Sequence, residues 1–108
     1  MEILEIRRLL QDAQTTGNGT AVNLDGTQRE VTIYLNAVGT VSAGAVQVET
    51  ADSETYSGTW APVTASPTTL VTDTTKVVQV TGAMLWIRAR ISTTITGGAK
   101  LTATILAN

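Results

Sequence analysis

The side chains that most often carry catalysis are absent from this sequence or scattered along it. The 108 residues include no histidine and no cysteine, so imidazole bases, thiolate nucleophiles and the usual zinc ligands are excluded. Asp52 and Glu54 form a close pair of carboxylates, the side chains that glycoside hydrolysis uses as acid and base. Both belong to a polar stretch that is typical of a solvated loop. We therefore expect a protein that is not an enzyme.

Two segments contain residue types that bind ions or cofactors in other proteins. The run Asp52-Ser53-Glu54-Thr55 offers oxygen ligands for calcium, but it lacks the closing bidentate glutamate of a calcium loop. Gly97 and Gly98 lack the spacing of a phosphate-binding loop and indicate a turn. The sequence therefore predicts no metal site and no cofactor.

The charge and hydropathy of the chain exclude two classes of partner. The formal net charge is −2, and the seven basic residues include no run that could neutralise several phosphates. Met1–Glu5 lacks the basic and apolar regions of a signal peptide, and no stretch approaches the roughly eighteen apolar residues that span a membrane. We expect a chain made in the cytoplasm, with no nucleic-acid partner and no membrane partner.

Three residues near the end of the chain could contact a protein partner. Trp86, Arg88 and Arg90 alternate with apolar residues, so they project from one face of the expected strand. Arginine is common at interfaces because its planar guanidinium pairs with carboxylates and stacks on aromatic rings. A solvated outer face is the alternative for the arginines. For Trp86 and Trp60 core packing is the favoured interpretation, since the chain has no phenylalanine, and an exposed contact is the alternative.

The rest of the chain reads as short β-strands joined by turns. Threonine makes up about a fifth of the residues, and this β-branched side chain suits a half-exposed pleated surface. Asp25-Gly26 and Gly97-Gly98 are expected to turn hairpins. Alternation of apolar and polar residues predicts strands over residues 20–24, 29–37, 43–51, 59–64, 76–81, 85–92 and 101–106.

Seven to eight strands at this spacing predict an all-β fold, an antiparallel β-sandwich formed by a single domain over residues 1–108. We expect a jelly-roll-like arrangement, and an immunoglobulin-like one is the alternative. The opening stretch fits two structures, because Ile3, Ile6 and Leu10 have helical spacing while Leu4 to Leu10 alternates. We expect an extended strand there after a short lead, and a single helical turn is the alternative.

Five segments together form a pattern of strands and turns over nearly the whole chain, and these are Leu9–Ala13, Thr16–Val22, Ala45–Glu49, Gly58–Val63 and Leu85–Ile91. This pattern resembles a family of small sandwich proteins encoded among the structural genes of tailed bacteriophages, the head-decoration or cement type. The likeness is one of strands and turns, and not of a catalytic signature. This sequence differs in its longer lead, residues 2–8.

The resemblance implies a structural protein of the virion that binds the major capsid protein on the capsid surface. Such proteins reinforce assembled capsids, often as homo-oligomers and in particular as trimers. Residues 1–8 would then form either an arm that adds a strand to a neighbour or an extra strand of the chain's own sheet. The residues expected to carry an arm contact are Ile3, Leu4, Ile6, Arg7 and Arg8.

Two other roles remain open at this point. A spike or fibre accessory domain would bind a host-surface glycan through exposed Tyr56, Trp60 or Trp86 and the neighbouring loops. A head or tail connector would join other parts of the virion. The number of copies per particle separates these roles from decoration, because a decoration protein is present in many more copies.

Overall fold

The computed structural model describes residues 6–24, 26, 30–64, 66–82 and 84–107. Within these residues the chain forms strands and turns, with no helix. The opening stretch is a strand from Ile6 to Ala13, so the expectation of an extended segment is confirmed there and the helical turn is wrong. The strands are β1 (Ile6–Ala13), β2 (Gly17–Asn18), β3 (Val22–Asn23), β4 (Glu30–Val38), β5 (Ala43–Ala51), β6 (Ala61–Pro62), β7 (Thr68–Thr69), β8 (Thr74–Thr81), β9 (Trp86–Thr96) and β10 (Lys100–Ala107).

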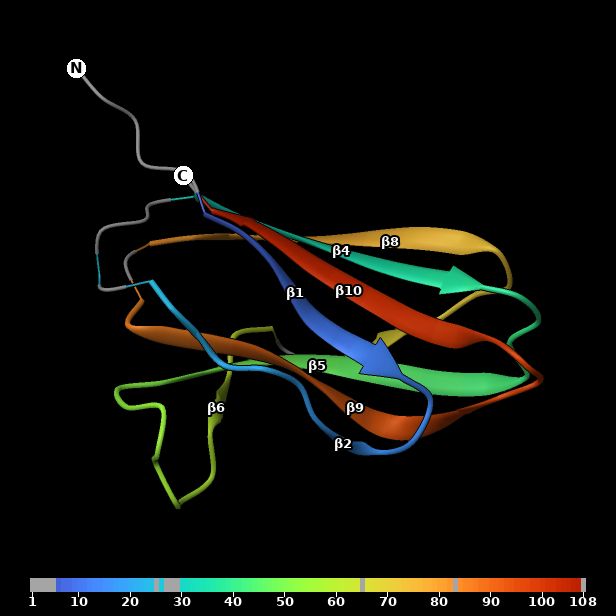
Figure 1. The fold of residues 1–108 in the computed structure, drawn as a ribbon, viewed down its shortest axis with the longest axis horizontal. Coiled ribbons are helices and arrows are strands. Elements are labelled where there is room, and N and C mark those ends of the chain that lie inside the picture. The colour runs from blue at the N-terminus through green and yellow to red at the C-terminus, as the bar shows by residue number, and fades with distance from the viewer. Residues whose placement is uncertain (1–5, 25, 27–29, 65, 83, 108) are drawn as a thin grey trace.

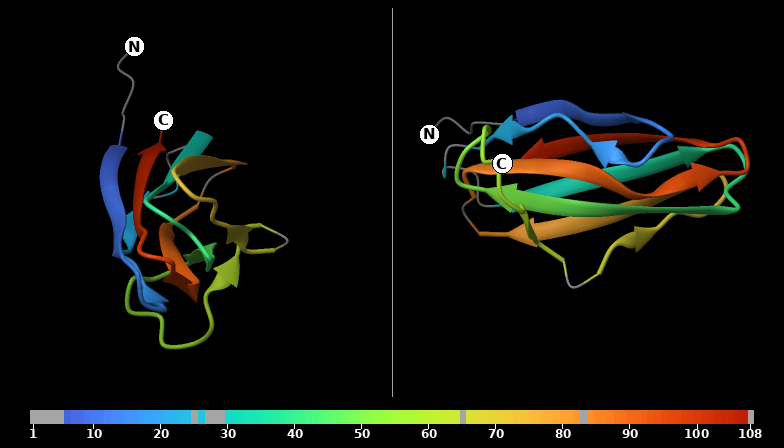
Figure 2. Two further views of the ribbon diagram at one scale, coloured as in Figure 1. Left: turned by 90° about the vertical axis from the view of Figure 1, so that its right-hand side faces the viewer. Right: turned by 90° about the horizontal axis from the view of Figure 1, so that it is seen from below.

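The strands form two antiparallel sheets that pack face to face (Figures 1 and 2). A four-stranded sheet has the order β1-β10-β4-β8. The other sheet has the order β2-β9-β5-β6, with β3 also on β9 and β7 also on β5. The expected β-sandwich is therefore confirmed. Pro62 lies in a two-residue strand at the edge of its sheet, where the missing backbone N–H costs no internal hydrogen bond.

The pairing of the strands is nested, and this identifies the topology. The first strand pairs with the last (β1 with β10), and β2 and β3 pair with β9. Inside these, β4 pairs with β8, and β5 pairs with β6 and β7. A long hairpin rolled into two sheets in this way is the jelly roll. The immunoglobulin-like alternative is wrong, because that fold does not pair its first strand with its last.

Two predicted hairpins are wrong for a common reason. The strands on either side of Gly97-Gly98, β9 and β10, lie in different sheets, so the turn is a corner between layers. Hydrogen bonds from Ala99 N to Thr40 O (3.0 Å) and from Ser42 N to Thr96 O (2.7 Å) hold this corner. The strands before and after Asp25-Gly26, β3 and β4, also lie in different sheets, while Asp25 itself lies outside the described residues.

The core lies between the two sheets and consists of aliphatic side chains. Each long strand contributes alternate residues to it, as the period of two requires. In β4 these are Val31, Ile33, Leu35 and Ala37, all at most 1% exposed. Leu70, in the connection between β7 and β8, is buried in the same cluster. The other large, fully buried side chains are Leu10, Leu24, Val46, Val48, Ile87, Ile91, Leu101 and Ile105.

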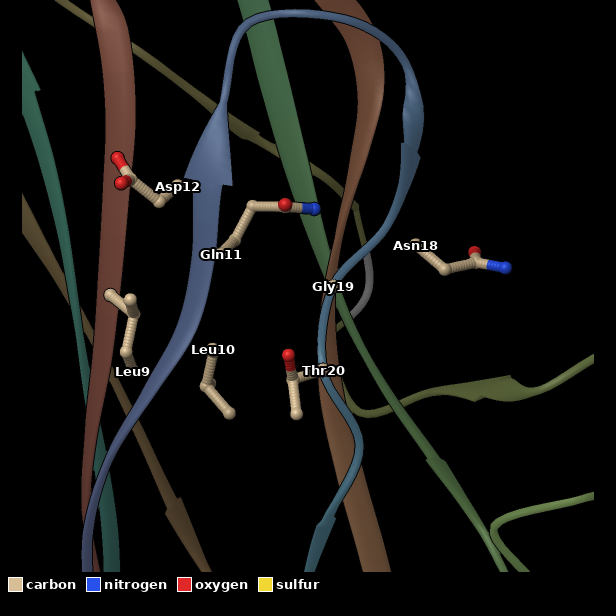
Figure 3. Close-up of a pocket in the computed structure, with 7 residues that line it drawn as sticks. All are labelled: Leu9, Leu10, Gln11, Asp12, Asn18, Gly19 and Thr20. Carbon is tan, nitrogen blue, oxygen red and sulfur yellow. The ribbon is translucent and has the colours of Figure 1, made fainter.

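One long side of the sandwich is closed by hydrogen bonds between the sheets. Leu10 occupies a bulge in β1, and its carbonyl accepts a hydrogen bond from Thr20 N (2.7 Å). Gly19 N donates to Ala89 O of β9 (2.9 Å), and the Gln11 side chain reaches toward the same segment (Figure 3). A Cβ on Gly19 would collide with the backbone carbonyl oxygens of Leu10 and Ala89. Only glycine therefore allows this close approach.

Candidate functional site

The outer face of the four-stranded sheet displays a row of side chains that crosses all four strands. Leu9 of β1 lies opposite Thr104, Thr104 lies opposite Tyr34, and Tyr34 lies opposite Val77. Leu9 is 51% exposed, Tyr34 is 39% exposed and Val77 is 51% exposed. We call Leu9, Thr104, Tyr34 and Val77 the outer row. A row with an aromatic ring and two exposed aliphatic side chains on one sheet face is a surface suited to protein contact.

The neighbouring row on the same face is polar and bonded within itself. Asp12 lies opposite Thr102, and Asn36 lies between Thr102 and Thr75. Thr102 Oγ1 donates to Asp12 Oδ1 (3.4 Å), and Thr75 Oγ1 donates to Asn36 Oδ1 (3.1 Å). These polar groups already satisfy one another, which leaves the outer row as the part of the face best suited to an added contact.

An ion pair flanks the polar row at the end of β10. Lys100 Nζ lies 2.8 Å from Asp12 Oδ1, and both side chains are largely exposed. The hydrogen bond from Lys100 is the largest effect and holds the pKa of Asp12 below its ordinary value of 3.8, against desolvation, which raises it. The positive charge of Lys100 and the hydrogen bond from Thr102 lower the pKa further. The carboxylate is therefore ionised at neutral pH.

The predicted contact residues of β9 lie on the outer face of the other sheet. Trp86, Arg88 and Arg90 are all partly buried and alternate with the fully buried Ile87 and Ala89, as expected from the sequence. Leu85 differs from the expectation, because the strand begins at Trp86 and Leu85 is 44% exposed. The three residues therefore share one face, although their environments differ.

Arg88 is bound by two neighbours from its own chain. It lies directly opposite Glu49 of β5, and its Nε lies 2.9 Å from Glu49 Oε1. The guanidinium carbon lies 4.1 Å from the ring centroid of Trp60, a cation–π arrangement. The side chains of Arg88 and Glu49 are 16% and 10% exposed. These contacts fix the segment around Trp60 to the sheet.

Trp60 is a packing residue and not an exposed platform. It is 2% exposed, and its indole nitrogen donates to Tyr56 O (3.4 Å). The same covering segment holds Gln47 of β5, whose Nε2 donates to Thr64 Oγ1 (3.0 Å). The expected packing role of Trp60 is therefore confirmed, whereas Trp86 is only partly buried.

The solvated loop predicted around Asp52 and Glu54 is confirmed as a polar, solvent-facing segment. Asp52 and Glu54 are both exposed, as a solvated carboxylate pair should be. Tyr56, 47% exposed, lies beside an open hollow of about 260 Å³. In the described residues there is no group of three or more His, Cys, Asp or Glu placed to hold a metal ion. No helix in the described part of the chain is long and apolar enough to cross a membrane.

The predicted arm residues fall at the start of β1. The backbone of Ile6, Arg7 and Arg8 pairs with Ala107, Leu106 and Ile105, so these residues extend the chain's own sheet. Ile3 and Leu4 lie outside the described residues. A groove of about 290 Å³ lies farther along β1, between Leu9–Asp12 and residues 18–20 (Figure 3). The Gln11 side chain lines this groove, and its Nε2 donates hydrogen bonds to the backbone carbonyls of Gly17 and Ala89.

The strand order defines the class as a jelly-roll β-sandwich, and the comparisons with known proteins show a likeness of fold alone. No protein-family model matches the sequence, and no curated protein matches it. Among solved structures, the chain is similar to the SPBc2 prophage-derived protein YomS, with a TM-score of 0.66 and 12% sequence identity. The match covers 100% of this chain and 97% of YomS. The likeness therefore extends over the whole fold.

Proposed function

We propose that the protein is a non-enzymatic structural protein of a bacteriophage virion, a decoration protein that binds the major capsid protein and stabilises the head. In this role it lies on the capsid surface and acts as a homo-oligomer. The fold of a prophage-derived protein supports the phage setting. The resemblance of the sequence to head-decoration proteins supports the more specific role.

The observation that carries the proposal is the outer row. Leu9, Tyr34 and Val77 lie on one open sheet face, where water contacts about half of each aliphatic side chain. Covering such a row removes apolar surface from water and stabilises a complex. A rigid antiparallel sheet holds the side chains in one layer, so little conformational entropy is lost when a partner covers them.

Arg90 and Trp86 offer a second surface on the opposite sheet. Both are partly exposed, and within the described residues Arg90 forms no ion pair like the one between Arg88 and Glu49. In the proposed role, this face would meet an acidic patch on a neighbouring capsid subunit. Arg88 serves mainly to hold its own loop.

The direct test is binding to undecorated capsids of the phage that encodes the protein. We expect saturable binding at a fixed ratio to the capsid subunit, and a higher melting temperature of the decorated capsid. Binding at a few copies per particle would indicate a connector or spike component and would contradict decoration. Absence of binding to intact capsids would contradict it as well.

A second candidate function, glycan binding, rests on the hollow beside Tyr56. The hollow combines this exposed aromatic ring with the Asp52 carboxylate and the Thr50 and Thr59 hydroxyl groups. An aromatic ring and hydroxyl or carboxylate acceptors are the groups that a sugar ring contacts. A glycan array distinguishes the two functions. A protein that only decorates capsids should bind no glycan on the array, whereas specific glycan binding should be lost in the Tyr56→Ala variant.

A further inference from the structure

Two arginines of β9 occupy successive positions on the outer face of the six-stranded sheet. Arg88 and Arg90 lie two residues apart on this strand, so they project from the same face. Arg88 lies opposite Glu49 of β5, and Arg90 lies opposite Gln47 of the same strand. The side chains of Glu49 and Gln47 have the same length, but only that of Glu49 carries a charge. Arg90 therefore lacks the carboxylate that Arg88 has.

Arg90 has a neutral amide on each side of it. β9 lies between β2 and β5 (Figure 1), and Asn18 of β2 is the neighbour of Arg90 on the side away from Gln47. The Gln47 amide is already engaged, because its Nε2 donates to Thr64 Oγ1 and to Val48 O, both at 3.0 Å. Within the described part of the chain, no ion pair includes Arg90. Its positive charge is therefore not neutralised by these neighbours.

This environment favours the binding of a carboxylate. The Arg90 side chain is partly buried, and an ion pair is stronger where water is partly excluded. The planar guanidinium presents parallel N–H groups that match the two oxygens of a carboxylate. Asn18 is exposed on the adjacent strand, about 5 Å away, and its amide can donate a further hydrogen bond to the same group.

A single unneutralised charge fits a carboxylate better than a phosphate. The other arginine of this face, Arg88, is already paired with Glu49 at 2.9 Å. A phosphate group carries nearly two negative charges at neutral pH and is typically bound by a cluster of basic side chains. An aspartate or glutamate side chain carries one charge, which Arg90 alone can balance.

We propose that Arg90, assisted by Asn18, binds one aspartate or glutamate side chain of the major capsid protein. This inference rests on the proposed function and deepens it, because it names the residue and the chemical group that meet on the second surface. The two arginines of β9 then have separate roles. Arg88 holds the segment of its own chain around Trp60, and Arg90 binds the partner.

Variants of Arg90 test the contact through capsid binding. Arg90→Gln should weaken binding to undecorated capsids about tenfold or more, because a charge-assisted hydrogen bond is lost. Arg90→Lys should have a smaller effect, since it keeps the charge and loses only the paired N–H groups. Lys76→Gln is the matched control and should bind as the unmodified protein does. Lys76 is likewise a partly buried basic residue, but it lies on the edge strand β8 of the other sheet.

The outcomes separate this inference from the proposed function. If the unmodified protein binds capsids and Arg90→Gln binds equally well, the inference is wrong and the proposed function stands. If the unmodified protein does not bind capsids, the proposed function is wrong.

Urea denaturation distinguishes a role in the complex from a role in the fold. Arg90→Gln should shift the unfolding midpoint much less than Arg88→Gln, because only the loss of Arg88 leaves a partly buried carboxylate unpaired. An equal shift for the two variants would show that Arg90 is a structural residue and would overturn the inference.

A titration with acetate tests the site without capsids. Acetate supplies the carboxylate group alone, and sodium chloride at the same ionic strength is the control. In NMR spectra, the Nε–Hε signal of Arg90 should shift saturably with acetate, while that of Arg88, whose Nε donates to Glu49, should stay in place. Equal shifts of the Arg90 signal with acetate and with chloride would show a general response to anions and would overturn the carboxylate site.

Discussion

Glu49 and Arg88 lie directly opposite each other on β5 and β9 and form a 2.9 Å ion pair on the outer face of their sheet, with side chains only 10% and 16% exposed. The outer faces of the sheets in a β-sandwich are usually exposed to solvent. Here the segment around Trp60 covers the pair, so that both strands are buried on two sides at this point. A charged pair removed from water in this way stabilises the fold only while both partners are present.

Arg88→Met should destabilise the protein by about 1–3 kcal/mol, because Glu49 would be left with its charge partly buried and unpaired. Adding Glu49→Gln should recover part of this loss, since the double variant has no unpaired charge. Urea denaturation of the two single variants and the double variant measures the coupling. Strictly additive losses would show that the two side chains do not interact.

Trp60→Ala should loosen the segment over the sheet and leave the central core intact. Trp60 contacts Arg88 and is not part of the main core cluster. We expect amide exchange in residues 52–64 to accelerate about tenfold or more, with little change in β10, since local openings are independent of global unfolding. Equal acceleration in both regions, measured by NMR or mass spectrometry, would show that Trp60 supports the whole fold.

Gly19→Ala should be among the most damaging single-methyl changes in the chain. Its Cβ would meet two backbone carbonyl oxygens, those of Leu10 and Ala89, and backbone cannot move aside as a flexible side chain can. We expect a loss of at least about 2 kcal/mol in denaturant unfolding. Gly17→Ala is the matched control, because its Cβ has only a 3.9 Å contact with Thr15 O, and its effect should stay within about 0.5 kcal/mol.

The Asp12–Lys100 pair gives a defined dependence of stability on pH. The folded-state pKa of Asp12 is lowered, chiefly by the hydrogen bond from Lys100. The stabilising contribution is therefore present above pH 3.8 and is lost as the pH falls through the lowered pKa. Lys100→Met should raise the pKa of Asp12 in an NMR titration and remove that part of the pH dependence. An unchanged titration would mean that the pair does not form in solution.

Val77→Thr tests the outer row without changing the fold. Threonine keeps the β-branched shape, and the position is 51% exposed, so the stability should change by less than about 0.5 kcal/mol. In the proposed role, capsid binding should weaken severalfold because an apolar contact is lost. Val71→Thr, the same change at a 44% exposed position outside the row, should bind as the unmodified protein does. Equal binding by all three proteins would exclude the outer row from the contact.

The longer strands were predictable because their alternation is a local property. Residues 29–37 and 43–51 agree closely with β4 and β5, and the jelly-roll order is as expected. The connections at Asp25-Gly26 and Gly97-Gly98 were not predictable in the same way. A glycine turn indicates that the chain reverses direction, but it does not indicate which sheet contains the next strand. That choice depends on which edges other strands leave free, and those strands are distant in sequence.

The environment of Arg88 could not be predicted from the sequence pattern either. Glu49 and Gln47 alternate with Val46 and Val48, which indicates one wet face and one dry face. Both faces are in fact buried, because the segment with Trp60 and Thr64 covers the outer face of β5. No local sequence pattern predicts that this segment lies there. The shared face of Trp86, Arg88 and Arg90 was predictable, whereas the partner of Arg88 was not.

The nested pairing of strands also sets the time at which the chain can fold. β1 is synthesised long before β10, at residues 100–107, yet β10 is its partner along the sheet. Strand pairs so distant in sequence form slowly, since a long loop must close before any contact is gained. While the chain is still on the ribosome, the apolar residues of β1 therefore remain exposed. Productive folding is accordingly expected to follow translation of β10, and a chain cut before residue 100 should aggregate and not accumulate as a folded intermediate.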